Sequence, residues 1–213
     1  MIVNERIVAY IQSLERGNSE LVEEIEKYAI KTHVPIIRKE MESFLAVMLQ
    51  IKQPNRILEI GTGIGYSAIL MSEYINEHAT ITTIENYDKR IEIAKENIKK
   101  YNKEKKIKLI SGDSLKILPT LEDKFDFVFM DAAKAQYIYF LPQILRLLNK
   151  DGVLVSDNVL QDGEIIESRF AITRRNRTIH SRMREYLYTI KNTPELTTTI
   201  IPIGDGITLS VKK

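Results

Sequence analysis

Residues 56–67 read RILEIGTGIGYS and set a glycine-rich turn directly after a short hydrophobic strand. Gly61, Gly63 and Gly65 let the backbone turn sharply there and come close to a ligand. A helix is expected from about Tyr66, and the free N–H groups of its first turn would face an anionic ligand. The stretch predicts a nucleotide-binding turn, and a plain strand-to-helix connection is the alternative. A nicotinamide dinucleotide fits less well, because Tyr66 stands where the pattern G-x-G-x-x-G needs its third glycine.

Short β-branched and aromatic runs follow this stretch and alternate with helical ones. They read ATITTIE at 79–85, IKLI at 107–110, FDFVFM at 125–130 and GVLVSD at 152–157. Such alternation predicts a parallel sheet with helices on both faces. Residues 197–213 hold two more strand-like runs around a Gly-Asp-Gly turn, which predicts an antiparallel hairpin. We therefore expect an α/β, Rossmann-like fold with a mostly parallel seven-stranded sheet and a C-terminal antiparallel hairpin.

The first 51 residues have a different period. Apolar side chains recur there at helical spacing, in one stripe before residue 15 and in another from residue 41 to residue 49. We expect three helices in 1–51, which form an N-terminal helical cap, and a Rossmann-like core in 52–213. No repeat or linker interrupts the sequence, so 1–213 is interpreted as a single domain. A helical cap beside an open sheet edge makes a homodimer the expected assembly.

Composition limits the remaining choices. Hydrophobic residues make up 44% and charged residues 28% of the chain, which is typical of a globular protein and not of a disordered one. No apolar run reaches the roughly 20 residues of a membrane span, and the first residues lack the basic start and apolar centre of a signal peptide. We expect a cytoplasmic protein without a membrane partner. Since the chain has no cysteine, any metal must be bound by oxygen or nitrogen.

Polar residues follow the second and third predicted strands. Glu85 ends the second strand 20 residues after Gly65, where a carboxylate can accept hydrogen bonds from ribose hydroxyls. Asp113 and Ser114 follow the third strand and could reach an adenine edge. Each of these residues alone would more often cap a helix or form a turn. Their order along successive strand ends favours a bound nucleotide cofactor.

Two acids and an amide follow the fourth and fifth predicted strands. Asp131 ends the fourth strand, and Asp157 ends the fifth with Asn158 beside it. Because these strands are expected to be near neighbours, the three side chains would converge at the carboxyl edge of the sheet. Three hard oxygen ligands suit Mg²⁺ better than Zn²⁺. In the alternative interpretation, the two aspartates only cap the helices that follow them.

Lys134 lies one helical turn beyond Asp131, so its amine is expected near the same edge. An amine held beside a cation can act as a general base toward a hydroxyl group. The alternative is an ordinary solvated surface lysine. His33, in the stretch THVPI, is one of three histidines and is expected to pack or cap, not to catalyse.

Taken together, these motifs resemble a known family. EIGTGIGYS, IENYD, GDSL, FMDAAKAQY and SDNV, in this order, are similar to motifs of the metal-dependent class I O-methyltransferases, which include the catechol and caffeoyl-coenzyme A enzymes. The resemblance covers nearly the whole chain from Pro35 onward. It implies that S-adenosylmethionine is the cofactor, that Mg²⁺ or another divalent cation is bound, and that Lys134 is the base. The implied metal ligands are Asp131, Asp157 and Asn158. The implied cofactor site consists of Gly61, Gly63, Ser67, Glu85, Asp113, Ser114 and Asp131.

A basic segment follows the last of these motifs. Residues 169–184 contain six arginines and no acid, whereas residues 1–168 carry 26 acidic and 22 basic side chains. Arginine clusters pair with phosphates, and several such contacts dominate nucleic-acid affinity. We expect Arg174, Arg175 and Arg177 to contact RNA phosphates. The alternative is a solvated helix face or a dimer contact.

The basic segment, with HVPI and IPIGDGI, is similar to the bacterial branch that methylates 5-hydroxyuridine at the wobble position of the tRNA anticodon. A uridine 5-hydroxyl next to O4 offers a metal the same two oxygens as a catechol, so tRNA is the expected substrate. Beyond Tyr186 and Tyr188, no aromatic platform for stacking bases is evident. Two alternatives stay open. Small catechol-like or hydroxycinnamoyl phenols would not need the arginines, and a non-catalytic nucleotide-binding module would need neither the metal ligands nor Lys134.

Overall fold

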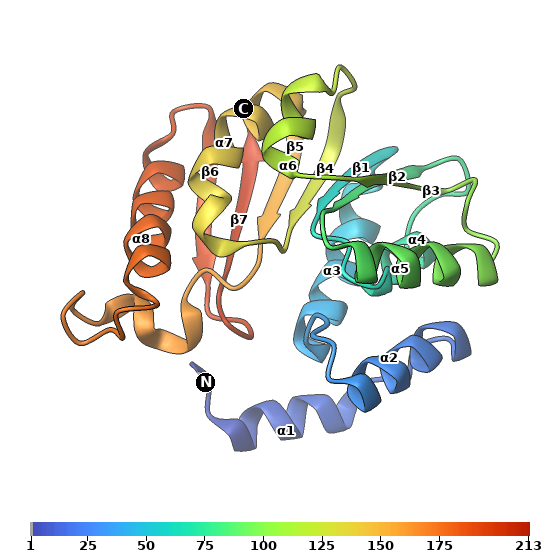
Figure 1. The fold of residues 1–213 in the computed structure, drawn as a ribbon, viewed down its shortest axis with the longest axis horizontal. Helices are drawn as coiled ribbons and strands as arrows, with labels where there is room; N and C mark the ends of the chain where they lie inside the picture. The colour runs from blue at the N-terminus through green and yellow to red at the C-terminus, as the bar shows by residue number, and fades with distance from the viewer. Residues whose placement is uncertain (1) are drawn as a thin grey trace.

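A computed structural model describes residues 2–213 as a seven-stranded sheet with helices on both faces (Figure 1). The strand order is β3-β2-β1-β4-β5-β7-β6. The strands from β1 to β5 pair in parallel, whereas β7 pairs antiparallel with both β5 and β6. This arrangement confirms the predicted sheet and its C-terminal hairpin. The strands are β1 Arg56–Ile60, β2 Thr80–Glu85, β3 Ile107–Ser111, β4 Phe125–Met130, β5 Leu148–Ser156, β6 Leu196–Ile201 and β7 Ile207–Lys212.

Three helices precede the sheet, as the apolar spacing predicts, and the others connect or follow its strands. None of the helices in the described part of the chain combines the length and the apolar character needed to cross a membrane. The α-helices are α1 Glu5–Leu14, α2 Glu20–Thr32, α3 Lys39–Lys52, α4 Tyr66–Glu73, α5 Asp88–Lys100, α6 Ser114–Ile117, α7 Tyr137–Leu147 and α8 Arg177–Asn192. The short 3₁₀ helices are η1 Leu118–Thr120, η2 Lys134–Gln136 and η3 Gln161–Ile166.

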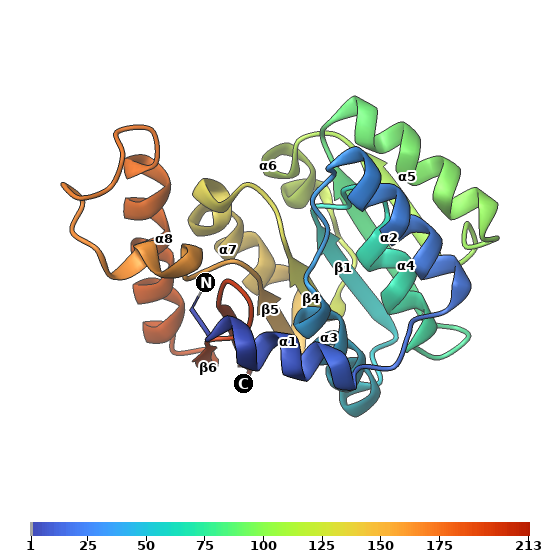
Figure 2. The same cartoon turned by 90° about the horizontal axis from the view of Figure 1, so that it is seen from below.

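Successive residues of the central strands enter two different cores, one on each face of the sheet. On β1, Ile57 packs with residues of α2, α3 and α4, whereas Leu58 and Ile60 pack with residues of α7 and α8. Side chains of a strand point alternately to its two faces, so a strand covered on both faces is hydrophobic throughout. Figure 2 separates the layers, with α2, α4 and α5 beside one another and α7 and α8 on the other side of the central strands.

The N-terminal helices differ in how firmly they are packed. α2 and α3 bury apolar side chains such as Ile25 and Leu45 in the core below α4. No residue of α1 is buried, and Ile7, Tyr10 and Leu14 are all more than half exposed. His33 is the left-handed C-cap of α2, which agrees with the capping role expected for it. The cap is therefore anchored by its second and third helices.

The sheet brings the carboxyl ends of its parallel strands to one edge. β1, β2, β4 and β5 are adjacent and run in the same direction, so the loops that follow them gather there. The hairpin places β7 between β5 and β6, although β7 follows both in the sequence. The turn before β7 thereby lies close to the loop after β5, where Leu160 N–H donates to Asp205 O at 2.8 Å.

Candidate functional site

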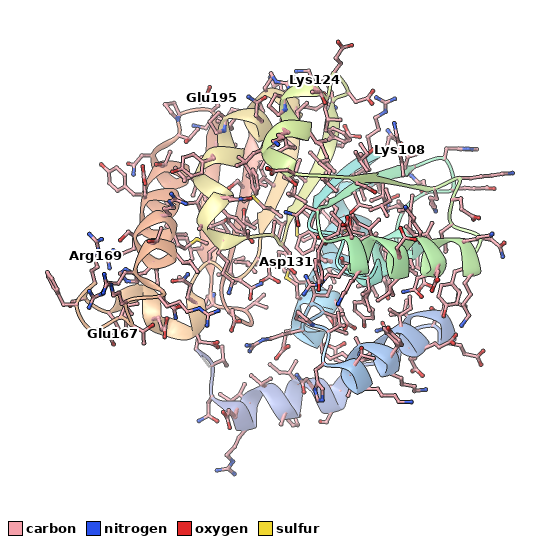
Figure 3. All side chains as sticks on the ribbon, viewed as in Figure 1. Lys108, Lys124, Asp131, Glu167, Arg169 and Glu195 are labelled. Carbon is pink, nitrogen blue, oxygen red and sulfur yellow. The ribbon has the colours of Figure 1, made fainter. Side chains whose placement is uncertain are left out.

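A cavity of about 740 Å³ opens at the carboxyl edge of the sheet. Its walls come from the loops after β1, β2, β4 and β5, from residues 35–38 before α3, and from residues 203–205 of the hairpin turn. Figure 3 shows Asp131 at this edge, between the two halves of the molecule. The predicted site residues that line the cavity are Gly61, Gly63, Ser67, Glu85, Ser114, Asp131, Lys134, Asp157 and Asn158. Asp113 does not line it.

The glycine turn touches the loop that carries the predicted metal ligands. Gly61 has a φ of 102°, and a β-carbon added to it would lie 1.9 Å from the carbonyl oxygen of Asp131. Only glycine fits this close approach of two backbones. Gly65 is the N-cap of α4 and supplies no capping side chain, so N–H groups of the first helical turn stay free beside the cavity. The turn can therefore bring a cofactor and a metal into one space.

Glu85 supports the glycine turn from the end of β2. Its Oε2 accepts a hydrogen bond from Gly63 N–H at 2.8 Å. Its Oε1 accepts from the backbone N–H groups of Asn86 and Tyr87 at 2.9 and 3.0 Å. A carboxylate has about four lone-pair positions, so Glu85 can still accept a ribose hydroxyl. The placement is compatible with the expected ribose contact and adds a second role, the support of Gly63.

The two polar residues after β3 have different surroundings. Asp113 is the N-cap of α6, and its Oδ1 accepts the backbone N–H of Leu115 at 2.9 Å. Ser114 lines the cavity. Asp113 thus has the helix-cap role that was its alternative interpretation, and its contact with a cofactor stays a prediction.

Glu59, which was not among the predicted site residues, lies beneath the turn on β1 and is fully buried. The hydroxyl groups of Ser67 and Thr83 each donate to it at 2.5 Å, and Thr83 Oγ1 lies 2.6 Å from Thr62 Oγ1. Burial raises the pKa of Glu59 to about 7, against the effect of the two hydroxyl donors. The sequence signal was an acid inside the hydrophobic run RILEI, next to the glycines.

The side chains of Asp131, Asp157 and Asn158 meet where β4 and β5 end. Asn158 Nδ2 donates to Asp131 Oδ1 at 3.1 Å, and Asn158 N–H donates to Asp157 Oδ1 at 2.6 Å. Ala133 and Leu160 are the N-caps of the helices that follow, and neither is helped by a side chain. The alternative in which both aspartates serve only as helix caps is therefore wrong.

The electrostatics of these three residues suit a cation. Burial raises the pKa of Asp131, and burial together with the nearby Asp131 raises the pKa of Asp157 to about 7. Two buried carboxylates are costly unless a proton or a cation neutralises them. Within residues 2–213, no group of three or more His, Cys, Asp and Glu side chains is arranged so that it could hold a metal ion, so a metal here also needs the amide oxygen of Asn158. Two carboxylates and an amide are hard donors, and they fit Mg²⁺.

Tyr137 joins the two strand ends that carry these ligands. It is fully buried, and its hydroxyl accepts the N–H of Ala132 at 3.3 Å. The same hydroxyl lies 3.2 Å from Met130 O and 3.1 Å from Asp157 O, and its one proton is shared between these acceptors. This positioning role was not predicted, because a buried aromatic residue at the start of a helix is usually only part of the core.

Lys134 is the first residue of η2 and lines the cavity. Burial is the larger influence on the pKa of Asp131, and the charge of Lys134 opposes it. Arg182 of α8 braces η2 from outside. Its Nη1 donates to Ala135 O at 3.4 Å, and its guanidinium lies 5.1 Å from the centre of the Tyr139 ring. The predicted base is therefore held on a short helix that α8 supports.

Arg38 joins three segments beside the cavity, a role that sequence reasoning missed. Its Nη2 lies 2.7 Å from Asp205 Oδ1 in the hairpin turn and 3.5 Å from Asp162 Oδ1 in η3. Burial raises the pKa of Asp205, whereas the hydrogen bond with Asp205 lowers the pKa of Asp162. This link ties the N-terminal cap to the core at the entrance to α3.

None of the predicted RNA-contacting arginines lines the cavity. Arg174 and Arg175 are exposed in the loop before α8 and make no hydrogen bond within the described residues. Arg177 Nε donates to Ile172 O at 3.1 Å, so this side chain holds the loop. The structure thus leaves Arg174 and Arg175 accessible and gives Arg177 a local structural contact.

The aromatic residues of the same region differ in their exposure to solvent. Tyr186 is fully buried, with its hydroxyl 2.5 Å from Ser156 Oγ and its ring 5.5 Å from that of Tyr137. It cannot stack on a base. Tyr188 is 74% exposed, and Phe170, which was not predicted, is 86% exposed beside the arginines.

The chain is similar to several known proteins in sequence and in fold. The family described as O-methyltransferase matches residues 12–213. A protein of Arabidopsis thaliana described as a candidate caffeoyl-CoA O-methyltransferase is 31% identical over 89% of this chain and 85% of its own. A catechol O-methyltransferase of Niastella koreensis is 32% identical over 58% of each chain. The SAH-bound structure of a methyltransferase of Podospora anserina is 28% identical, with a TM-score of 0.88 over 98% of this chain and 94% of that one.

Proposed function

The chain belongs to the O-methyltransferase family, and we infer that its methyl transfer uses a divalent cation held by Asp131, Asp157 and Asn158. The enzyme depends on S-adenosylmethionine and is of the catechol and caffeoyl-CoA class. One observation carries the inference of a metal. The glycine turn and two buried carboxylates line the same cavity. Gly61 also approaches the backbone of Asp131 more closely than any other residue type could.

The residues around the cavity have distinct roles in this proposal. Glu85 and the glycine turn would hold S-adenosylmethionine and orient it toward the acceptor hydroxyl. A bound divalent cation would orient two neighbouring acceptor oxygens and make the hydroxyl more acidic. Lys134 accepts the hydroxyl proton. S-adenosylmethionine would supply the methyl group, and the loss of its sulfonium charge would balance the proton that Lys134 takes up.

We further propose that the acceptor is 5-hydroxyuridine of tRNA. The support is electrostatic, because Arg174 and Arg175 are exposed and unpaired within the described residues, and six arginines occur in residues 169–184 without an acid. The named relatives support the alternative of a small phenol or a hydroxycinnamoyl thioester. The non-catalytic module is excluded by membership of the family.

One experiment tests both parts of the proposal. Labelled S-adenosylmethionine is incubated with the enzyme and tRNA, caffeoyl-CoA or a catechol panel, each with EDTA or with Mg²⁺. We expect transfer to tRNA with Mg²⁺ and none with EDTA. Asp157→Ala should lose transfer under both conditions. The control Asp123→Ala should keep it, because that acid is exposed and pairs with Arg56 at 2.7 Å.

The results separate the metal from the acceptor. Normal turnover in EDTA would contradict the metal site. Transfer to catechols or caffeoyl-CoA and never to tRNA would contradict the RNA acceptor and leave the metal site intact. With tRNA as substrate, Arg174→Ala combined with Arg175→Ala should flatten the salt dependence of binding, by roughly 0.7 to 0.9 in log–log slope per lost phosphate contact.

A further inference from the structure

A second hollow of about 540 Å³ lies between α8 and the segment that follows η3. It shares no lining residue with the central cavity. Figure 3 shows Glu167 and Arg169 on this outlying segment, well away from Asp131. The residues that line the hollow are Ile166, Glu167, Ser168, Arg169, His180, Ser181 and Arg184.

His180 is the unusual member of this set. Its side chain is 2% exposed, and neither ring nitrogen has a hydrogen-bond partner within residues 2–213. A neutral imidazole carries one donor and one acceptor, and an imidazolium carries two donors. A buried polar group without a partner costs free energy, so a histidine in this position favours a ligand that can pair with it. The hollow that His180 lines is where such a ligand can bind.

The surrounding groups determine what ligand fits. Arg184 follows His180 by four residues and Ser181 by three, so it is a neighbour of both on the surface of α8, and all three line the hollow. Arg184 Nη1 donates to Ile165 O at 2.9 Å, which fixes the guanidinium and leaves its other donors unpaired within the described residues. Arg169 adds a second guanidinium, and Glu167 is the one carboxylate that lines the hollow. Two arginines repel a cation, whereas arginine, histidine and serine donors together suit the oxygens of a phosphate.

We propose that this hollow binds a phosphate group of the methyl acceptor, an inference that rests on the proposed function. Asn158 of the central cavity and Ile166 of the hollow are only eight residues apart in the sequence. A fully extended chain of that length spans less than about 30 Å, so one acceptor of nucleotide size or larger can reach both places. Both an RNA backbone and a coenzyme A thioester carry such phosphates, whereas a free catechol carries none.

The first test needs no turnover. The protein has three histidines, which we expect to give separate imidazole NMR signals, and the signal lost in His180→Gln would identify His180. Titration with inorganic phosphate should shift this signal. His33 and His78 are exposed and lie outside the hollow, so they serve as internal controls. The absence of a specific shift at His180 would overturn the proposal.

The second test places a negative charge in the hollow. Ser181→Asp should raise the KM for the phosphate-bearing acceptor relative to the KM for a catechol by about ten- to a hundredfold, the usual loss of a charged hydrogen bond. Asn192→Asp is the matched control, because Asn192 is an exposed residue at the other end of the same helix and does not line the hollow. Its KM ratio should stay close to that of the wild type.

The acceptors identify the source of the phosphate. A rise with tRNA assigns the hollow to an RNA backbone, and a rise with caffeoyl-CoA assigns it to coenzyme A. Equal effects of the two aspartates would mean that only net charge matters, and would overturn the site. A wild-type enzyme that methylates no acceptor would refute the proposed function alone, since the His180 titration still decides whether phosphate binds.

Discussion

Asp131 takes part in the site through its backbone as well as through its side chain. Its N–H donates to Ile60 O at 3.0 Å, which extends the pairing of β1 and β4 by one residue. Its carbonyl oxygen borders Gly61, and its carboxylate accepts from Asn158. Asp131 therefore links the glycine turn to the proposed cation site. A shift of Asp131 would also displace Gly61 and Asn158.

The role of Lys134 can be tested by removing its amine. Lys134→Ala should lower kcat by about 10²- to 10⁴-fold, the usual contribution of a general base. The loss should shrink at high pH, because an acceptor hydroxyl that is already ionised needs no base. Methyl-transfer rates measured across pH, with calorimetry of cofactor binding, check this expectation.

A matched control separates the base from a general effect of charge. Lys124→Ala also removes a lysine, but Lys124 is exposed and bonds to the carbonyl oxygen of Arg146 away from the cavity. It should keep normal turnover. If Lys134→Ala stayed within a few-fold of the wild type at neutral pH, the base would have to be another group.

Single residues show why the sequence predicts some roles and misses others. Strand order alone indicates that Asp131 and Asp157 share an edge, and the structure places them there. Glu59 and Tyr137 depend on partners 5 to 24 residues away in the sequence, for instance Thr83 for Glu59 and Ala132 for Tyr137. Such hydrogen bonds form only when the strands have paired, so no local sequence pattern predicts them.

At the scale of elements, the contact between the loops after β1 and β4 predicts that Gly61→Ala damages two functions at once. The added β-carbon would meet Asp131 O at 1.9 Å and must push the loops apart. Overpacking of this kind costs about 1–3 kcal/mol. We expect the variant to lose the rise in melting temperature that Mg²⁺ gives the wild type, even without cofactor. Thermal unfolding with and without Mg²⁺ measures it.

Gly63→Ala provides the comparison for this experiment. Gly63 also has a left-handed backbone, with a φ of 54°, but a β-carbon there would meet no atom within 4 Å. The two variants share backbone strain and differ in the collision. An unchanged Mg²⁺ response in Gly61→Ala, or an equal loss in both variants, would show that the loop contact does not position the metal ligands.

The elements also differ in how well the sequence predicts them. The runs at β1 and β4 match the strands residue for residue, because hydrophobic strands covered on both faces are unbroken. The region after β5 holds η3, which was not predicted from the sequence. Gln161, Asp162 and Gly163 have left-handed backbones there, and Asp162 is linked to Arg38. Contacts across the chain, not local preference, determine that segment.

At the scale of the whole molecule, the buried Glu59 makes stability depend on pH. Its pKa rises from 4.5 to about 7 in the folded protein, so the folded state binds the proton more tightly than the unfolded state. The tighter proton binding stabilises the folded state. This stabilisation is complete below the pKa of Glu59 in the unfolded state and is lost as the pH rises through its pKa in the folded state. It amounts to at most about 3 kcal/mol. As the pH rises from about 4.5 to 7, the free energy of unfolding of Glu59→Gln should therefore fall less than that of the wild type. Urea unfolding measures this difference.

The comparison isolates one group, because Asp131 and Asp157 also have raised pKa values and are present in both proteins. Glu92→Gln is the control, since Glu92 is an exposed residue of α5 that pairs with Lys95. It should follow the wild-type curve. Parallel curves for Glu59→Gln and the wild type would mean that Glu59 does not carry this linkage.

The predicted homodimer stays a prediction. Ile7, Tyr10 and Leu14 leave apolar surface on α1 of the helical cap. The fold itself was predictable because strand periods and turn residues are local signals. The surfaces that α1 and α8 leave exposed were not, since exposure depends on what the rest of the chain covers.

The position of β7 between β5 and β6 has a consequence for the order in which the strands pair during folding. Because β7 is the one sheet neighbour of β6, β6 can join the sheet only together with β7. Until β7 is in place, β5 and β6 both have unpaired edges, which can pair with another chain. When β7 completes the sheet, it covers the edge of β5 and pairs with β6, and these edges are no longer open to aggregation.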